Sequence, residues 1–541
     1  MSTFIDSEEI KSLLTVPESE AYQKISELNR RLGASTSFQS VDTTTREGIA
    51  KLVETGLKNK PSLFAPVLEL IRVLGRDKRQ LDLVLTEPVR LFIIHASGLS
   101  ESGSEVLQDV IEADKCLINT LFNSACMRTT FETEATPYLL GRIIALTESD
   151  FSGRYEWIKN ISEELRNDIL LFDLRIAFLM SAHSTRIQLD WGNSPSALSA
   201  FLEVIHRYIA AASELETVEP AEVERRLASV CDRAGEAAKV LFNITYKRSD
   251  GLDEHFTDKI TKVVAALIKR RNFSPTMEQH AMNLLATLKL NIDILCPVVD
   301  SEDGGTEQYN HHDMTFAQAL LDAMERKLDD NNNSDSELLS TYFGSALKLC
   351  TASKEACRYC RLKILPPMVA ADVARRPDEG DSLRNKIIRV MMSPTFSKDL
   401  ASEFMFVLCK RSVNRLIKYT GLGHSAGLLA NSGLLGQINL PKSASDSEDS
   451  ETEDYKAVED RINPVTGYLR PESPGVSPFE GMSEEQKEYE AMKLVDAMSK
   501  LMDTGVVKPG TIGDDGRPKA VGHVLELVKH IPDEEGERDS E

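Results

Sequence analysis

The sequence predicts an all-α protein, a helical solenoid followed by an acidic tail. Over about the first 420 of its 541 residues, apolar side chains recur at spacings of three and four, which is the helical period. Alternation typical of strands is nearly absent there, and the breaks between helices are short and polar. After residue 440 the pattern changes to an acidic Ser/Thr run and a stretch rich in Pro and Gly. Many helices with short links, sustained over this length, favour a solenoid over a bundle.

The apolar period predicts individual helices in chain order. Polar breaks separate them, for example at 147–153 and 192–195, and two acidic, Asn/Gly-rich insertions at 300–313 and 329–337 are expected to be surface loops. The expected helical segments are Leu63–Leu74, Val106–Phe122, Ile169–Met180, Ala197–Ala211, Ala234–Ile244, His280–Leu290 and Phe404–Leu416.

Composition limits the class of protein. Hydrophobic residues make up 41% of the chain, enough for a large core, yet no run of 18 or more apolar residues predicts a transmembrane segment. The N-terminus lacks the basic and apolar regions of a secretory signal. All eight cysteines precede residue 410, the pattern of reduced thiols in a cytosolic protein. The one close pair, Cys357 and Cys360, has no second pair at metal-ligand spacing, so inert thiols or a redox role remain open.

Charge and motifs argue against two functional classes. The net charge is −22, and residues 441–541 hold 25 acidic against 12 basic side chains, so nucleic acid is not expected as the main ligand. We find no Gly-rich phosphate loop, no Gly-x-Ser-x-Gly and no His/Cys/Asp set at metal spacing. We therefore expect no catalytic residue, no cofactor and no metal site. His311 and His312 lie in an acidic loop, where solvated side chains are expected.

A weak internal repeat points to ligand binding by the solenoid. The segments 114–123 and 238–243 both end in Leu-Phe-Asn, at Asn123 and Asn243, and Asn283 lies on a further apolar helix. In armadillo repeats the last helix of each unit carries such an Asn on its inner face, where the amide can both donate to and accept from a ligand's backbone. The alternative is an Asn that caps a neighbouring helix or lines a packed turn.

Two arginines are candidates for the same face. Arg72 and Arg76 stand one helical turn apart, so they share a side of the helix and could hold a carboxylate. The alternative is a pair of solvated arginines.

The tail contains one well-formed amphipathic helix. Ser483 followed by Gln486 is a capping box, and Gly505 supplies a stop. The apolar stripe suits an adaptable interface because it contains two methionines, although it could also dock back on the solenoid. The residues expected to bind a partner are Leu494, Val495, Met498, Leu501 and Met502.

The acidic run matches the pattern of acidophilic phosphorylation, which requires an acid three residues after the acceptor. Ser443, Ser445 and Ser450 satisfy the pattern, although an unmodified, solubilising run is the alternative. Each phosphate would add about −1.5 to −2 charges and three strong acceptors. The basic side chains expected to receive them are Arg375, Arg376, Arg384, Lys386, Lys410 and Arg411.

Several segments resemble the synembryn family, named for resistance to inhibitors of cholinesterase. The resemblance covers roughly residues 60–502. Two departures, Leu422 between two glycines where the family has Tyr and Tyr468 where many relatives have Arg, indicate a divergent member. The segments that carry the resemblance are the two Leu-Phe-Asn segments, Phe172–Arg175, Arg384–Arg389, Ala401–Cys409, Leu416–Gly423, Ala426–Leu429, the acidic run, Ile462–Gly467 and Glu480–Val495.

The resemblance implies a guanine nucleotide exchange factor and folding chaperone for heterotrimeric G protein α subunits. The family's body is an armadillo/HEAT-like superhelix whose concave face takes the C-terminal helix of the G protein, and its tail contacts the Ras-like domain. The family's regulatory phosphosites fall on Ser445 and Ser450. On the concave face, the expected partner-binding residues are Arg72, Arg76, Asn123, Arg175, Phe178, Asn243 and Asn283.

The resulting expectation is a cytoplasmic monomer, with recruitment to the cell cortex left open. Its partners would be a GDP-bound or nucleotide-free α subunit and an acidophilic kinase. The alternative is an armadillo-type adaptor for peptide motifs without exchange activity, although such adaptors carry Trp/Asn pairs in each repeat and this chain has two Trp. The expected segments are the solenoid (1–425), a connecting helix or linker (426–440), the acidic linker (441–482), the tail helix (483–505) and a flexible acidic C-terminus (506–541).

Overall fold

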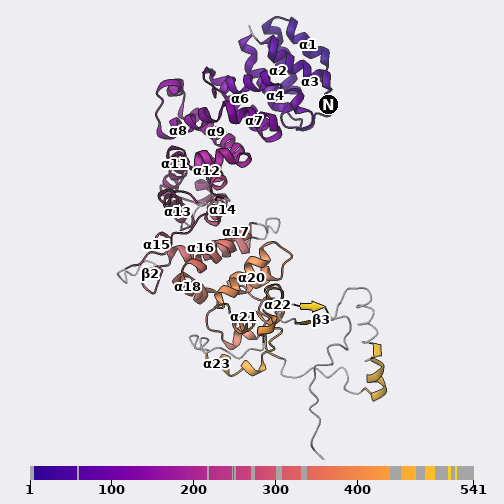
Figure 1. Ribbon diagram of the computed structural model, residues 1–541, viewed down its shortest axis with the longest axis vertical. Coiled ribbons are helices and arrows are strands. Elements are labelled where there is room, and N and C mark those ends of the chain that lie inside the picture. The colour runs from indigo at the N-terminus through magenta and orange to yellow at the C-terminus, as the bar shows by residue number, and fades with distance from the viewer. Residues whose placement is uncertain are drawn as a thin grey trace, which may run out of the picture. The chain divides into compact units, whose positions relative to one another are not determined.

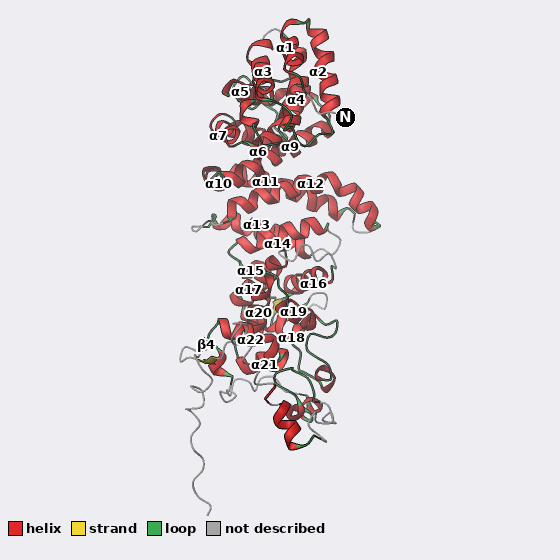
Figure 2. Ribbon diagram, turned by 90° about the vertical axis from the view of Figure 1, so that its right-hand side faces the viewer, coloured by secondary structure: helices red, strands yellow, loops and turns green. Residues whose placement is uncertain are grey.

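The computed structural model divides the chain into two compact units, Met1–Ile294 and Leu295–Glu541. It is almost wholly helical over the part it describes (Figures 1 and 2). The described residues are 5–57, 60–215, 218–246, 248, 251–269, 274–299, 307–330, 338–438, 452–470, 482–490, 492–493, 510–512 and 518–520.

The first unit consists of two rows of helices in which each helix packs on the next of its own row. We call one of them the ladder row, because polar contacts described below link its helices. It runs α2 (Glu18–Leu32), α4 (Phe64–Leu74), α6 (Leu107–Asn123), α9 (Glu163–His183), α12 (Pro220–Thr245) and α14 (Pro275–Thr287).

The second row covers the other side of the same core, and Figure 2 shows its α11 and α13 beside α12 and α14. It runs α3 (Thr43–Lys51) with the π-helical turn Leu52–Gly56, then α5 (Glu87–Ala96), α7 (Ala125–Glu134), α8 (Thr136–Glu148), α11 (Pro195–Ser213) and α13 (Glu254–Lys269). The short elements of this unit are α1 (Ser7–Thr15), α10 (Thr185–Gly192), the 3₁₀ turns Pro61–Leu63, Leu81–Leu83 and Gly153–Asn160, and α15 (Ile292–Leu295), which spans the boundary of the two units.

At three places a single serine links two helices, each time with the same pair of hydrogen bonds. Ser124 joins α6 to α7, Ser184 joins α9 to α10, and Ser353 joins α17 to α18, each with extended backbone. Each serine N–H donates to the carbonyl four residues earlier, and each hydroxyl accepts from the N–H three residues later, at 3.1–3.2 Å. One residue therefore caps the end of one helix and the start of the next.

A buried ion cluster joins three helices of the first unit. Arg142 on α8 donates to both Asp114 on α6 and Asp173 on α9, and all three side chains are at most 1% exposed. Its Nη1 also donates to the Ser97 carbonyl at 2.5 Å. Each of the three guanidinium nitrogens therefore donates to a protein acceptor, as a buried charge requires.

The second unit is also helical and packs around α17 and α20. A two-residue hairpin, β1 (Gln308–Tyr309) with β2 (His312–Asp313), precedes its helices. The helices are α16 (Thr315–Asp329), α17 (Leu339–Ala352), α18 (Lys354–Ile364), α19 (Leu383–Met391), α20 (Ser397–Leu408), α21 (Val413–Thr420) and α22 (Leu422–Asn431), with 3₁₀ turns at Ala370–Val373 and Leu435–Gln437. Farther along lie α23 (Glu453–Lys456), the 3₁₀ turn Glu459–Arg461, and the strand pair β3 (Gly510–Ile512) and β4 (Pro518–Ala520).

Residues 452–470 lie along this unit as a strap, a name we keep below. The Leu422 and Gly423 N–H groups donate to the Pro464 and Val465 carbonyls at 2.9 and 2.8 Å, and the strap's Leu469 N–H donates to Val373 at 2.8 Å. Tyr455 is only 3% exposed. The strap thus occupies part of the stretch expected as an acidic linker.

Two glycines explain why the Gly-Leu-Gly and Ile462–Gly467 motifs meet there. Gly421 and Gly467 both have φ of +76°, in the left-handed region that favours glycine. A Cβ on Gly421 would lie 3.0 Å from the Gly467 nitrogen, and one on Gly467 would lie 2.6 Å from Pro377 Cγ. Neither backbone could approach so closely with a larger residue.

The all-α prediction is confirmed, and the two rows of the first unit form the repeated helix packing expected of a solenoid. Two helix ends differ from the prediction. The helix expected over 280–290 ends at Thr287. The helix expected over 404–416 is two helices, because Lys410 and Arg411 adopt positive φ and Ser412 caps the start of α21. No described helix is long and apolar enough to cross a membrane.

Candidate partner-binding surface

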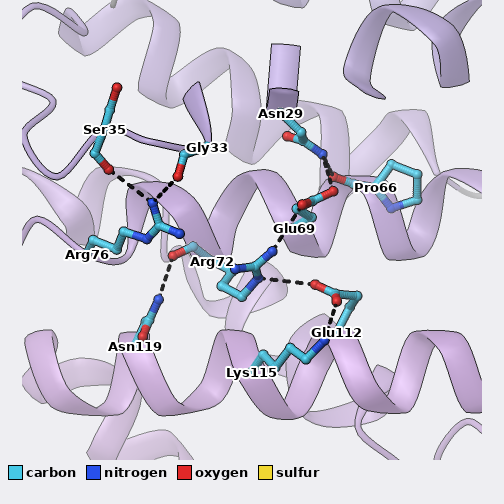
Figure 3. A network of polar contacts seen from close by, with 10 residues as sticks. All are labelled: Asn29, Gly33, Ser35, Pro66, Glu69, Arg72, Arg76, Glu112, Lys115 and Asn119. Carbon is cyan, nitrogen blue, oxygen red and sulfur yellow. Dashed lines mark hydrogen bonds and ion pairs between the residues drawn. The ribbon is translucent and has the colours of Figure 1, made fainter. Parts of the chain in front are cut away.

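Polar side chains connect α2 to α4, α4 to α6 and α9 to α12 in the ladder row, beginning with Arg72 on α4. Its guanidinium forms ion pairs with Glu69 at 3.0 Å and with Glu112 on α6 at 3.1 Å, and Lys115 pairs with the same Glu112 at 2.9 Å (Figure 3). The Arg72 side chain is 20% exposed. It is therefore a paired arginine whose remaining surface faces outward.

Arg76 binds backbone rather than carboxylate. Its Nη1 donates to the Gly33 carbonyl at 2.7 Å and to the Ser35 carbonyl at 3.1 Å, just past the end of α2 (Figure 3). A cation at these carbonyls is favourable because the helix dipole is negative there. The alternative of two solvated arginines does not describe this pair.

Two asparagines of α6 reach the end of α4. Asn119 Nδ2 donates to the Arg72 carbonyl at 2.9 Å (Figure 3), and Asn123 Nδ2 donates to the Gly75 carbonyl at 2.8 Å. Both satisfy terminal carbonyls that lack helical partners. Sequence reasoning missed Asn119, although it stands four residues before Asn123 and therefore on the same helix face.

The next two asparagines are also bonded within the row. Asn243 Nδ2 on α12 donates to Ser181 Oγ at 3.0 Å and to the Phe178 carbonyl at 3.3 Å, both on α9. Asn283 Oδ1 accepts from Gln279 Nε2 at 3.0 Å. The helix-capping alternative therefore describes Asn123 in the partner-free chain, whereas Asn243 donates to residues within α9. Contact with a ligand remains a prediction for all three.

Charged and aromatic groups continue the ladder between α9 and α12. Arg175 lies 3.5 Å from Glu236, and Lys239 pairs with the same Glu236 at 2.6 Å. The Lys239 ammonium lies 4.5 Å from the centroid of the Phe178 ring, a cation–π distance. Arg175 and Phe178, predicted as partner-binding residues, are thus neighbours on one half-exposed surface.

A cavity of about 670 Å³ opens beside these residues on α12 and the start of α14. Its lining includes Cys231, Glu236, Lys239 and His280. Burial lowers the pKa of His280 to about 4, with a smaller contribution from the Lys239 charge, so the imidazole is neutral at physiological pH.

Exposed aromatic rings accompany two of the asparagines. Phe122 is 65% exposed immediately before Asn123, and Phe242, immediately before Asn243, stacks on the 49% exposed Tyr246. Exposed large apolar side chains beside polar groups are typical of interaction surfaces. The Leu-Phe-Asn repeat contained this signal, because its Phe recurs with its Asn.

In the second unit, the six cations expected to receive phosphate differ in their surroundings. Lys386 is 10% exposed between Glu325 and Asp329, both at 2.8 Å, and Arg384 lies 3.4 Å from Asp372. Arg376 pairs with Asp378 at 3.1 Å, whereas Arg375 and Arg411 are exposed. Lys410 is half-buried. At least three of the six therefore already have carboxylate partners.

The remaining predicted sites lie mostly outside the described residues. These are Ser443, Ser445 and Ser450, and the tail residues Leu494, Val495, Met498, Leu501 and Met502. The start of the tail helix is described: Ser483 and Gln486 exchange hydrogen bonds at 3.1 and 3.2 Å, which confirms the capping box.

Comparison with known proteins extends over nearly the whole chain. The family model described as guanine nucleotide exchange factor synembryn matches residues 67–517. "Chaperone ric-8" of Caenorhabditis elegans is 36% identical over 98% of this chain and 98% of its own, and its counterpart in Caenorhabditis briggsae is 39% identical over 87% and 88%. "Chaperone Ric-8A" of Danio rerio is 32% identical over 94% and 93%.

A chain from a solved structure titled "A conserved phosphorylation switch controls the interaction between cadherin and beta-catenin in vitro and in vivo" is 10% identical, with a TM-score of 0.31, and covers 82% of this chain and 97% of that one. A TM-score this low does not indicate a shared fold. The family model and the relatives confirm the resemblance found in the sequence, and the chain belongs to the synembryn family of guanine nucleotide exchange factors.

Proposed function

We propose that this protein is a guanine nucleotide exchange factor and folding chaperone for heterotrimeric G protein α subunits. The observation that carries the proposal is the match to the exchange-factor family over residues 67–517, together with relatives named as chaperones along their full lengths. The C-terminal helix of the G protein would bind the ladder row of the first unit, and the tail helix would support the opened Ras-like domain.

The chemistry of the ladder row supports this site. A helix C-terminus presents unpaired carbonyls and, at a chain end, a carboxylate, and both are acceptors. Arg72, Asn123 and Arg175 are donors with exposed surface, and Phe122 and Phe178 offer apolar contact beside them. In the partner-free chain the two arginines pair with carboxylates and Asn123 donates to a backbone carbonyl, so these donors are positioned before a ligand arrives.

Exchange follows from linkage and needs no catalytic side chain. A protein that binds the nucleotide-free α subunit more tightly than the GDP-bound form must lower the affinity for GDP by the same factor. The same preference stabilises an incompletely folded α subunit by mass action, which would account for chaperoning.

Three further features belong to this proposal. Phosphate on Ser445 and Ser450, added by an acidophilic kinase, would pair with basic side chains of the second unit and set the direction of the tail. The chain would act as a monomer. It would act in the cytoplasm, and the G protein would recruit it to the cell cortex.

The test is a binding and exchange experiment with purified α subunit. We expect retention of the GDP-bound or nucleotide-free form, loss of binding with a GTP analogue, and faster GDP release in the presence of this chain. Binding of a C-terminal peptide without any effect on GDP release would favour the alternative adaptor. Binding in no nucleotide state would overturn the proposal.

A further inference from the structure

Three cysteines of the second unit lie together where α17 turns into α18. Cys350 is near the end of α17, and Cys357 and Cys360 stand one turn apart on α18. The one-residue link at Ser353 folds the two helices against each other, so residues seven and ten positions apart come into contact. The Cys350 thiol is within hydrogen-bonding reach of both Cys357 and Cys360.

The three thiols are not equivalent. Cys357 is 8% exposed, Cys350 5% and Cys360 1%. Arg361 Nη2 lies 4.0 Å from the Cys357 sulfur, and the same guanidinium is fixed by a 2.7 Å bond from its Nε to the Leu408 carbonyl. Cys357 also belongs to the first turns of α18, where the helix dipole favours an anion.

These surroundings favour the thiolate at Cys357. The hydrogen bond from Cys350 is the largest cause that lowers its pKa to about 7, and the positive charge of Arg361 adds to it. Cys350, which donates that bond, has a pKa well above the ordinary value. By contrast, burial raises the pKa of Cys116 in the first unit, as in an inert core thiol.

We propose that Cys357 is a site of oxidation by hydroperoxides and that Cys350 resolves it into a disulfide joining α17 to α18. In the first step the Cys357 thiolate attacks a peroxide oxygen, the O–O bond breaks, and Cys357 becomes a sulfenic acid while hydroxide leaves. In the second step the Cys350 sulfur attacks the Cys357 sulfur, and the proton from Cys350 leaves with the sulfenic hydroxyl as water. The two thiols are oxidised by two electrons and the peroxide is reduced.

Geometry favours Cys350 over Cys360 as the resolving thiol. Side chains three residues apart on one helix have Cβ atoms about 5–6 Å apart, whereas a disulfide needs about 3.5–4.5 Å. Cys350 approaches from the neighbouring helix, so no helical turn has to be distorted. The test of this site does not rely on the proposed function.

The test uses the full-length protein, a limiting dose of hydrogen peroxide, alkylation of the remaining thiols and mass spectrometry. We expect a Cys350–Cys357 disulfide before any oxidation of Cys126. Cys126 is the matched control because it is more exposed, but its neighbour at 3.1 Å is the carboxylate of Asp82 instead of a guanidinium. First oxidation at Cys126, or reaction of Cys357 only in denaturant, would overturn the proposal.

Variants separate the two steps. Cys350→Ser should leave a sulfenic acid at Cys357 that a dimedone probe traps, and Cys360→Ser should leave the disulfide intact. Arg361→Gln should slow oxidation of Cys357 several-fold because it removes the nearby charge. A disulfide between Cys357 and Cys360 would overturn the role of Cys350. Circular dichroism checks folding, and Cys350→Ala replaces the serine variant if that one unfolds.

Discussion

Arg142 and Asp173 form a doubly hydrogen-bonded ion pair inside the first unit, with Nε 2.9 Å and Nη2 2.5 Å from the two carboxylate oxygens. Asp114 accepts from the same Nη2 at 2.9–3.0 Å, so two buried carboxyls share one guanidinium. Two negative charges and one positive charge would leave the cluster with a net charge out of water, which is unfavourable. Burial, with the nearby Asp173 charge, accordingly raises the pKa of Asp114 to about 8.

The first prediction concerns stability against pH. Because the folded state binds a proton at Asp114 that the unfolded chain releases near pH 4, this stabilisation is complete at low pH and is lost as pH rises from about 4 to about 8. Asp114→Asn imitates the protonated form. In this variant the free energy of unfolding should fall less steeply with pH, by up to about 1.4 kcal/mol per pH unit. Urea unfolding at several pH values measures the dependence of the unfolding free energy on pH. The control is Glu105→Gln, which changes an exposed residue just before α6. Equal slopes in wild type and Asp114→Asn would contradict the prediction.

The second prediction tests the ladder row. Replacing Arg72 and Arg76 with Ala removes donors to Glu112 and to the Gly33 carbonyl, and it should weaken binding of the G protein by about 1.5–3 kcal/mol, which is roughly 10- to 150-fold. Calorimetric titration measures the affinity. Arg186→Ala, in an exposed pair with Asp190 on α10, is the control.

The same variant also tests the native role of these arginines. Because Arg72 and Arg76 bridge helices in the partner-free chain, we expect the variant to melt a few degrees below wild type. The melting temperature is measured without the G protein, so the effect is separate from the effect on binding. Unchanged affinity with a lowered melting temperature would show that the two arginines are structural only.

The sequence predicted the helical period well because that period depends on local spacing. It placed Asn123 and Asn243 on the right helices, yet it did not show whether their amides point to a ligand or to the next helix. That choice depends on Gly75 and Phe178, which lie 48 and 65 residues away in the chain. The break at Lys410 and Arg411 was also not predictable, because neither residue type favours the positive φ that both adopt there.

The third prediction separates the strap from the tail helix. A chain ending at residue 440 loses both, whereas a chain ending at 475 keeps the strap that covers Gly421 and buries Tyr455. Both should bind a peptide matching the C-terminus of the G protein through the first unit and lose most exchange activity. Only the shorter chain should unfold earlier in its second unit, which hydrogen exchange of α21 and α22 measures. Full GDP release by either truncation would refute the role of the tail.

The fourth prediction concerns the seat of the strap. In Gly467→Ala the new Cβ would lie 2.6 Å from Pro377 Cγ, and the φ of +76° would be strained for alanine. We expect about 1–3 kcal/mol of destabilisation, the range for a residue held in a sparsely populated backbone region. Gly427→Ala on α22, where an added Cβ meets nothing within 4 Å, is the control and should be neutral or slightly stabilising. Equal thermal stability of the two variants would show that the strap is not anchored at this contact.

The last prediction concerns phosphate on Ser445 and Ser450. Ordering the acidic run against the second unit reduces the entropy that the tail loses when it closes on the G protein, so exchange should become faster without new contacts to the partner. Lys386 and Arg384 already pair with carboxylates, so reversing their charge would place like charges together and disturb the fold. Exposed Arg375 and Arg411 are the sharper test, because Arg376 pairs with Asp378. Reversing Arg375 and Arg411 to Glu should abolish the gain from kinase treatment and leave the untreated rate near wild type.

The gain in wild type should also shrink as salt rises, because exposed pairs are screened. The measurement is the exchange rate of wild type and the charge-reversed variant, each with and without kinase treatment. An equal gain in both proteins would show that the phosphates bind other basic residues. No gain in either protein would show that the acidic run is only a solubilising segment.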